Sequence, residues 1–460
     1  MGTVIMILQL IAALSILVVL HEFGHFIAAR IFGIRVEKFY MFFNPKLSLI
    51  TYKKGEGLKF FVIHKKEDEK AENQEDNPHT TYGIGWLPLG GYVKISGMID
   101  ESMDKEQLKK PPQPYEFRSK PAWQRLIVMI GGVIMNLILG IVVLSFIHFK
   151  YTQNFLPVNE VNKNGIYAYE YGRQMGFQTG DKIVAINGKP FERFSEVTSY
   201  GVLFGDNITV ERDGKEIVID IPDTLYRALK KMEFPFVSAE NYPFHVDSLP
   251  EKSLARDAGI KPGDKFIALN GEEIKCIGQF RELLSKNKNK EIKLSVLRNN
   301  DTLYKTIQLD STGLLGFYHN LPDYKMAPYT WGKSFKYGTS DAIEMLIANV
   351  KGIGKIFSGK EKASESIAGP IAIATMFGNV WIWERFWRLV GLLSLILAFM
   401  NILPIPALDG GHVILTLIEW ISGRKIPDKV MEKIQMVGMI ILLLLMIYIF
   451  GNDIFRLFNK

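Results

Sequence analysis

Two histidines and a glutamate stand at a spacing that can bind a metal ion and activate water. In the segment HEFGH, residues 21–25, His21 and His25 are four positions apart and Glu22 follows the first of them. Residues i and i+4 of an α-helix lie on one face, so both imidazoles can reach the same ion. This is the spacing that a zinc ion needs for two ligands from one helical turn, and it leaves the intervening glutamate beside a metal-bound water. We therefore predict a zinc site at this segment.

A third protein ligand must come from elsewhere in the chain, because a catalytic zinc site normally has three. The segment MNILPIPALDGGH, residues 400–412, contains Asp409 after two prolines that end a helix and before two glycines that free the backbone. We predict Asp409 as the third ligand, and His412 is the alternative. In the competing interpretation no metal is bound, and the histidines and the glutamate only end a helix at a membrane surface.

Long segments without Asp, Glu, Lys or Arg predict the elements that carry these residues. They are residues 1–21, 126–149, 389–408 and 434–452. Each approaches or exceeds the ~20 residues that cross a bilayer as a helix. The first lacks the basic start and the small-residue cleavage site of a secretory signal, so we expect it to be retained as a membrane span.

The positions of Lys and Arg predict the orientation, because cytoplasmic loops are enriched in them. Basic residues follow the first apolar segment, precede the second and separate the third from the fourth. This pattern places 30–125 and 410–433 in the cytoplasm, and both termini and 150–382 outside. The first and third spans then run in parallel. HEFGH and Asp409 are therefore expected at matching depth near the cytoplasmic side.

The outer block contains an internal repeat. GFQTGDKIVAINGK at 176–189 recurs as GIKPGDKFIALNGE at 259–272, with seven of fourteen positions identical. Gly-Asp predicts a turn, the β-rich stretch a strand, and Asn-Gly the next turn. Two small β-rich domains are therefore expected. They resemble PDZ domains, which accept an extended peptide at a sheet edge, and the alternative is a spacer or size barrier with an unused groove.

The cytoplasmic block contains an apolar, glycine-rich stretch, YGIGWLPLGGYVKISG at 82–97. It is too short to span and too glycine-rich for a stable helix, so we expect a β-hairpin that dips into the membrane where protein covers its backbone. Its edge could pair with a guest strand. The polar segment at 65–80 is predicted to be an exposed insertion, and 327–382 to be amphipathic and interfacial.

Composition excludes two classes of site. The net charge of +7 is modest for 460 residues and comes without a run of Lys and Arg, so no nucleic-acid partner is expected. Cys276 is the single cysteine, which rules out an intrachain disulfide and a CxxC metal site.

Taken together, these motifs resemble the site-2 protease family of intramembrane zinc metalloproteases. The resemblance rests on HExxH in the first span, GGYVK at 90–94, the PDZ-like pair and NILPIPALDGGH, in that order. FRSKPAWQR at 117–125 and AGPIAIA at 368–374 are similar to further family segments. One departure is GVIMN at 132–136, where the family often has Gly-Pro-x-x-Asn. This departure weakens the role expected for Asn136.

The resemblance implies a role for individual residues: one zinc ion per chain, a catalytic glutamate, and a substrate held as an extended strand. The implied residues are His21, His25 and Asp409 for zinc, Glu22 for catalysis, and Asn401, Gly90, Gly91, Tyr92, Val93 and Lys94 for substrate binding.

It also implies a fold, a polytopic α-helical membrane protein with four transmembrane helices, a membrane-associated β-hairpin or sheet and two extracytoplasmic PDZ domains. The expected divisions are a first transmembrane helix at 1–29, a cytoplasmic or membrane-dipping β region at 30–125, a second transmembrane helix at 126–149, PDZ domains at 150–225 and 226–322, an amphipathic interfacial segment at 323–382, a third transmembrane helix with the LDG motif at 383–409, a cytoplasmic loop at 410–433 and a fourth transmembrane helix at 434–452.

The implied activity is hydrolysis of peptide bonds within the transmembrane segment of single-span proteins, in the bacterial inner membrane. Anti-sigma factors already cut on the outer side, or remnant signal peptides, are the expected substrates; membrane lipid and peptides at the PDZ domains are the other expected partners. Two alternatives belong to different classes. One is an inactive membrane-anchored PDZ adaptor. The other is a transporter that uses the same charged residues, although no transmembrane half is repeated.

Overall fold

The computed structural model describes residues 2–63, 79–88, 90–98, 111–229, 232–362 and 368–458. It divides into two compact units, the first formed by Met1–Tyr151 with Thr330–Lys460 and the second by Thr152–Tyr329. Most of the predicted polar insertion at 65–80 lies outside the described residues.

Four helices of the first unit are long and apolar enough to cross a membrane. They are α1 (Gly2–Ile31), α4 (Ala122–Ile147), α14 (Trp383–Ile402) and α16 (Asp428–Phe458). Many of their large apolar side chains are exposed to the surroundings, as expected for helices that face lipid. The described part of the chain thus contains the four predicted helices, each long and apolar enough to span a membrane.

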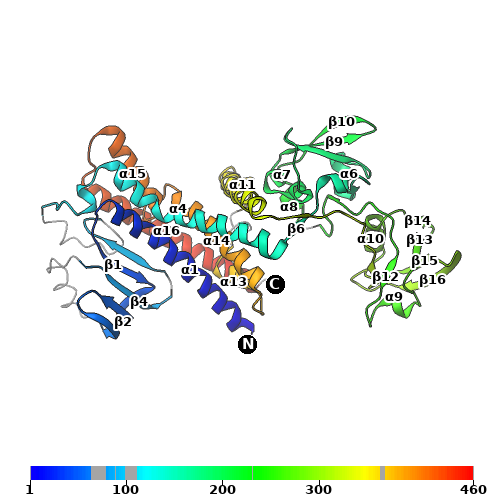
Figure 1. The fold of residues 1–460 in the computed structure, drawn as a ribbon, viewed down its shortest axis with the longest axis horizontal. Helices are drawn as coiled ribbons and strands as arrows, with labels where there is room; N and C mark the ends of the chain where they lie inside the picture. The colour runs from blue at the N-terminus through cyan, green and yellow to red at the C-terminus, as the bar shows by residue number, and fades with distance from the viewer. Residues whose placement is uncertain are drawn as a thin grey trace. The chain divides into compact units, whose positions relative to one another are not determined.

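Helix α4 is the centre of this bundle (Figure 1). It packs against α1, α14, α11 (Trp331–Phe357) and α15 (Asp409–Ser422). Glycines let two of these helices approach closely. A Cβ on Gly24 of α1 would collide with the carbonyl oxygen of Gly131 of α4, and a Cβ on Gly131 would lie 2.6 Å from the carbonyl oxygen of Gly24. The backbones therefore touch beside HEFGH, which brings this motif against α4.

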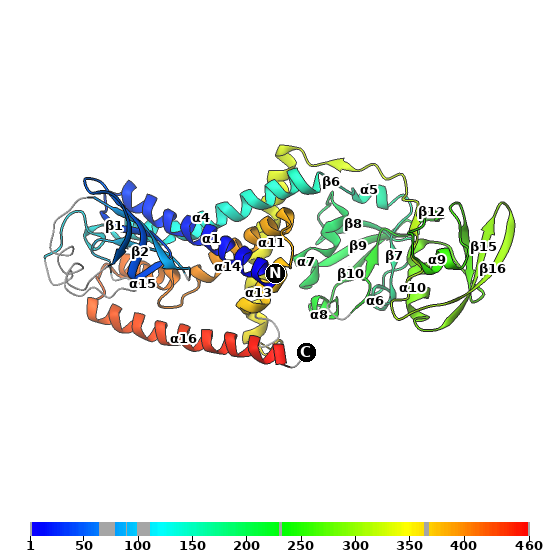
Figure 2. The ribbon, with the colours of Figure 1, turned by 90° about the horizontal axis from the view of Figure 1, so that it is seen from below.

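A five-stranded sheet follows α1, in the order β3-β2-β4-β1-β5. Its strands are β1 (Val36–Met41), β2 (Phe43–Lys53), β3 (Gly57–Ile63), β4 (Thr81–Leu87) and β5 (Tyr92–Ile95). Strands β1 and β4 are parallel, and the other pairs are antiparallel. Figure 2 shows the sheet beside the C-terminal part of α1. The predicted β region is thus a sheet, and the strand that follows GlyGly at 90–91 lies at one end of it.

A further helix of the first unit is α13 (Pro370–Phe377), which packs against α1, α14 and α16. Its N-terminus is held by a side chain of α16. The Asp453 carboxylate accepts hydrogen bonds from the backbone N–H groups of Gly369, Ile371 and Ala372, at 2.9–3.2 Å. A carboxylate is favourable there because it satisfies N–H groups that have no partner within the helix.

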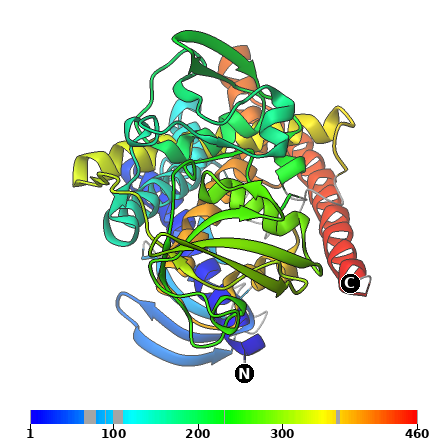
Figure 3. The same ribbon diagram turned by 90° about the vertical axis from the view of Figure 1, so that its right-hand side faces the viewer.

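The second unit contains two β-rich parts, each with its own apolar core. The first has a sheet of the order β10-β9-β8 and the second a sheet of the order β14-β13-β15-β16, drawn in green in Figure 3. The principal strands are β8 (Lys182–Ile186), β9 (Asn207–Arg212), β10 (Lys215–Asp220), β13 (Lys265–Leu269), β14 (Glu272–Glu273), β15 (Glu291–Arg298) and β16 (Asp301–Gln308).

The two copies of the sequence repeat adopt the same local structure. In the first part, Arg212 Nε donates to Asp181 at 2.7 Å, and in the second part Arg298 Nε donates to Asp264 at 2.7 Å. Each of these aspartates belongs to the Gly-Asp turn of its repeat, and each arginine ends a strand paired with the repeat's strand. The repeat therefore extends beyond the fourteen residues that the sequence revealed.

Candidate active site

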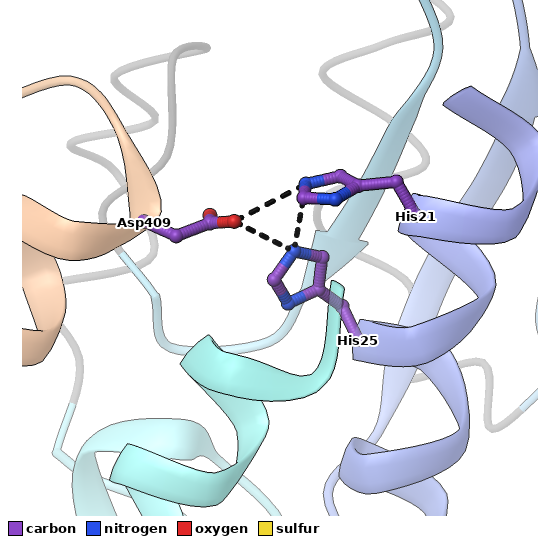
Figure 4. A group of neighbouring side chains, drawn as sticks. All are labelled: His21, His25 and Asp409. Atoms are coloured by element: carbon purple, nitrogen blue, oxygen red, sulfur yellow. Dashed lines mark hydrogen bonds and ion pairs between the residues drawn. The ribbon is translucent and has the colours of Figure 1, made fainter. Parts of the chain in front are cut away.

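Three side chains predicted as metal ligands lie together in the first unit. His21 and His25 come from α1, and Asp409 is the first residue of α15 (Figure 4). Asp409 Oδ2 lies 3.1 Å from His21 Nε2 and 3.4 Å from His25 Nε2, and the two Nε2 atoms are 3.3 Å apart. Both histidines are buried. The structure thus joins residues from opposite ends of the chain at one point.

The spacing of these atoms fits a zinc ion. Ligands that are about 2.0–2.2 Å from a tetrahedral ion lie about 3.3–3.6 Å from each other, and the three separations are 3.1, 3.3 and 3.4 Å. Asp409 Oδ2 is buried and accepts no hydrogen bond in the described structure. A buried carboxylate oxygen of this kind needs a cation. Two imidazoles and a carboxylate are ligands that zinc accepts.

Hydrogen bonds to α4 orient both imidazoles. His25 Nδ1 lies 2.8 Å from the carbonyl oxygen of Val128, which can only accept, so Nδ1 carries the proton and Nε2 offers its lone pair. His21 Nδ1 lies 3.1 Å from the amide nitrogen of Asn136, and the amide oxygen Oδ1 has no hydrogen-bond partner among the described residues. A half-turn of that amide exchanges its two ends, so Asn136 can accept the Nδ1–H of His21. Both Nε2 atoms are then available to a metal.

Asn136 is therefore more important than its altered sequence motif suggested. The loss of the proline in GVIMN did not displace the asparagine, because Gly132 and Asn136 are four residues apart on one face of α4. Gly132 lies directly beneath the rings. A Cβ there would lie 2.5 Å from His21 Cε1 and 2.5 Å from His25 Nε2. The sequence motif contained this glycine, but the reason for it depends on a neighbouring helix.

Glu22 is a residue of α1 whose carboxylate interacts electrostatically with the backbone N–H of Val93 in strand β5. Its Cγ is 3.7 Å from the position a Cβ would take on Gly91. The same Cβ would come within 2.7 Å of the Tyr40 carbonyl oxygen, so no larger residue fits at 91 without a shift. Since β1 pairs with one edge of β5, the N–H of Val93 shows that the other edge faces Glu22.

The remaining residues of the predicted substrate strand are placed as follows. Gly90, at φ 152°, and Gly91 precede β5. Tyr92 stacks on Tyr40 of β1, with ring centroids 5.3 Å apart, and Lys94 Nζ lies 3.2 Å from Glu37 Oε2. These contacts hold β5 against β1. The strand is therefore anchored through its side chains and through its β1 edge.

Asn401 was predicted to bind the substrate and His412 was the alternative third ligand, and the structure separates the two residues. Asn401, near the end of α14, has its amide nitrogen 3.2 Å from His21 Nε2. His412 Nε2 lies instead 2.7 Å from the amide nitrogen of Gln435 on α16. Among the described residues, the potential metal-ligating group is His21, His25 and Asp409. This favours Asp409 over His412 as the third ligand.

A strained turn delivers Asp409 to this point. Ala407 has φ 74°, a conformation that L-residues other than Asn and Asp rarely adopt. A Cβ on Gly411 would lie 2.6 Å from the Ile405 carbonyl oxygen, so the glycine lets α15 fold back onto the preceding turn. The two prolines and two glycines noted in the sequence are thus parts of one sharp bend between α14 and α15.

Fold and site together define a class. A helical membrane protein that holds two histidines and an aspartate at the spacing of a zinc ion, with a glutamate beside them, is built as a membrane-embedded metal-dependent hydrolase. The sequence model of peptidase family M50 matches residues 9–64 and 71–445. The chain belongs to this family, and the predicted membership of the site-2 proteases is confirmed.

Curated relatives agree with this assignment over almost the whole chain. The regulator of sigma-E protease RseP of Escherichia coli strain K12 is 27% identical over 476 residues, which cover 97% of this chain and 98% of the relative. RseP of Salmonella typhimurium is 25% identical, with coverage of 97% and 98%. A Treponema pallidum protein named "Putative zinc metalloprotease" is 26% identical, with coverage of 98% of both chains. The chain is a zinc metalloprotease of the site-2 type.

Proposed function

We propose that the protein hydrolyses peptide bonds within the transmembrane segment of single-span membrane proteins, with one zinc ion held by His21, His25 and Asp409. One observation carries the proposal. The edge of β5 that is not paired with β1 faces Glu22, beside the three predicted ligands. A peptide added to this edge would pass next to the catalytic groups.

Glu22 is the proton carrier in this proposal. A zinc ion, when bound, lowers the pKa of a coordinated water toward 7 and polarises the scissile carbonyl. The Glu22 carboxylate takes the proton of the attacking water and later gives it to the leaving amine. Val128 and Asn136 keep the two imidazoles in the required orientation throughout. Asn401, beside His21, is suited to contact or orient the substrate.

The edge strand β5 can supply hydrogen bonds to the backbone of the substrate. A transmembrane helix hides its carbonyl groups in internal hydrogen bonds, so it must unwind before a bond can be cut. Unpaired backbone groups are strongly disfavoured away from water. Addition of the unwound segment to β5 replaces the lost bonds with strand pairing. Gly90 and Gly91 let the chain lie close to Phe43 and to the Tyr40 carbonyl group before the strand begins, and residues 92–94 form the pairing edge.

The substrate class and the location are inferred from relatives and from charge. Relatives named regulator of sigma-E protease support regulated intramembrane proteolysis, with an anti-sigma factor shortened on its outer side or a remnant signal peptide as substrate. The Lys and Arg pattern supports a bacterial inner membrane protein with both termini and the β-rich parts in the periplasm. Those parts would be PDZ domains that exclude substrates with an intact outer domain or bind peptides.

The test compares the wild type with Glu22→Gln and uses Glu384→Gln as a matched control. Glu384 is an exposed residue paired with Arg388 on α14. Each protein is co-expressed with a single-span substrate shortened on its outer side, and zinc is measured in the purified enzymes. We expect cleavage by the wild type and the control only, with zinc in all three. Cleavage by Glu22→Gln would remove Glu22 from its role. Absence of cleavage and of zinc in the wild type would favour the inactive PDZ adaptor.

A further inference from the structure

A buried ion pair joins the start of α4 to the far part of α15. Arg125 Nη2 lies 2.5 Å from Glu419 Oε2, and the two side chains are 9% and 4% exposed. The second oxygen of Glu419 accepts a hydrogen bond from the backbone N–H of Ile426, at 2.7 Å. Two charges buried in this way contribute little net stability compared with apolar side chains of the same size. The ion pair is therefore better explained by the geometry that it fixes than by the stability that it adds.

The position of Arg125 on α4 connects the pair to the active site. Residues 125, 128, 132 and 136 are separated by three or four positions, so they form one stripe along the helix. Within this stripe Val128 orients His25, Gly132 lies beneath both rings and Asn136 contacts His21. The stripe that holds both imidazoles therefore also holds α15.

Asp409 depends on the placement of α15, because it is the first residue of that helix. The segment before it is a bend with Ala407 at φ 74°, and the N-cap residue Leu408 makes no side-chain capping hydrogen bond. Glu419 is ten residues further on, about 15 Å along the helix. A contact at that distance limits the tilt and rotation of α15, and so the direction of Asp409.

We propose that Arg125 and Glu419 are positioning residues, which set the geometry of the third zinc ligand relative to the two histidines. Through Glu419, Arg125 fixes the position of α15 relative to the stripe of α4 that orients His21 and His25. The inference rests on the proposed zinc site, because it concerns the aim of Asp409 toward that ion. Removal of the pair leaves all three ligands in the chain but moves one of them.

The experiment uses the purified full-length protein in detergent. Zinc affinity is measured by competition with a chelator, and Co²⁺ is then substituted to record visible absorption, which reports coordination geometry. The variants are Glu419→Gln, Arg125→Lys and the double variant Arg125→Met/Glu419→Leu, which keeps apolar packing without the ion pair. The control is Arg388→Gln, since this arginine pairs with Glu384 at the surface. Thermal unfolding without metal shows which variants are folded.

We expect Glu419→Gln and the double variant to weaken zinc binding by ~10–100-fold, the range for residues that orient metal ligands. Arg125→Lys retains the charge without the planar fork and is expected to lose less. The control should match the wild type. A folded Glu419→Gln or double variant with wild-type zinc affinity and cobalt spectrum would overturn the proposal. Loss of fold in all three variants would also overturn it, in favour of a stability role. A wild type that binds no zinc would instead refute the zinc site itself.

Discussion

Gly132 offers the sharpest test of how closely α4 and the two imidazoles fit together. In Gly132→Ala the new Cβ would lie 2.5 Å from His21 Cε1 and from His25 Nε2, whereas ordinary van der Waals contact begins at 3.4 Å. The rings or the helix must therefore move by about 0.9 Å. Ligand distances in a zinc site tolerate only about ±0.2 Å, so the displacement is several times too large. Alanine itself favours a helix over glycine, by about 0.5–1 kcal/mol.

We expect Gly132→Ala to weaken zinc binding by about 100-fold, which corresponds to about 2.8 kcal/mol, and to lower proteolysis at limiting zinc. Chelator competition on the purified protein measures the affinity, and cleavage of a single-span substrate across a zinc titration measures the activity. Gly352→Ala is the matched control, because a Cβ at that helical glycine would meet nothing within 4 Å. Wild-type zinc affinity in a folded Gly132→Ala protein would refute the close fit inferred between α4 and the rings.

Further predictions concern the third ligand, the edge strand and the joint between the β-rich parts. Asp409→Ala should abolish stoichiometric zinc binding while His412→Ala retains it, measured by metal analysis; the reverse result would move the ligand to His412. Pro at Tyr92 or Val93 removes a strand N–H and should impair cleavage of membrane substrates, and normal turnover by both variants would contradict strand addition. Burial raises the pKa of Glu282, but hydrogen bonds from Arg173 and Tyr167 outweigh it and hold the pKa below its usual value of 4.5. Because the folded pKa is the lower one, the stabilisation is present above pH 4.5 and is lost as the pH falls below it. Helix α10 (Ile277–Lys286) contains Glu282, so its hydrogen-exchange protection should drop in acid in the wild type. In Glu282→Gln the protection should be low at all pH values. Equal protection in both proteins would contradict this prediction.

Local patterns in the chain were sufficient to predict the main helices, the two β-rich parts and part of the candidate site. Apolar runs of about twenty residues predict membrane helices wherever they occur, because the bilayer thickness alone sets the requirement. The spacing of His21 and His25 also predicts a shared helical face from local sequence, because it depends only on the helix repeat. The repeated Gly-Asp turns predicted two similar β-rich parts before any contact between strands was known.

The choice between Asp409 and His412 needed the tertiary structure. Both residues follow the same bend and both are acceptable zinc ligands, so sequence spacing does not separate them. The fold separates them, because Gln435 of α16 contacts His412 while Asp409 turns toward α1. Asn136 shows the same limit: its motif had lost a proline, and its value became evident only from the ring nitrogen beside it.

The sequence by itself therefore predicted the candidate membrane helices, the family and the candidate metal ligands on α1, because each depends on neighbours within a few residues or on composition. Only the tertiary structure decided how α4 contributes to the site. Gly132 and Arg125 both stand in segments that resemble family motifs, but those motifs do not say what either residue contacts. Their importance comes from what packs against them: two imidazoles in one case, and in the other a glutamate 294 positions away along the chain. Such contacts between distant residues leave no local periodicity by which they could be predicted.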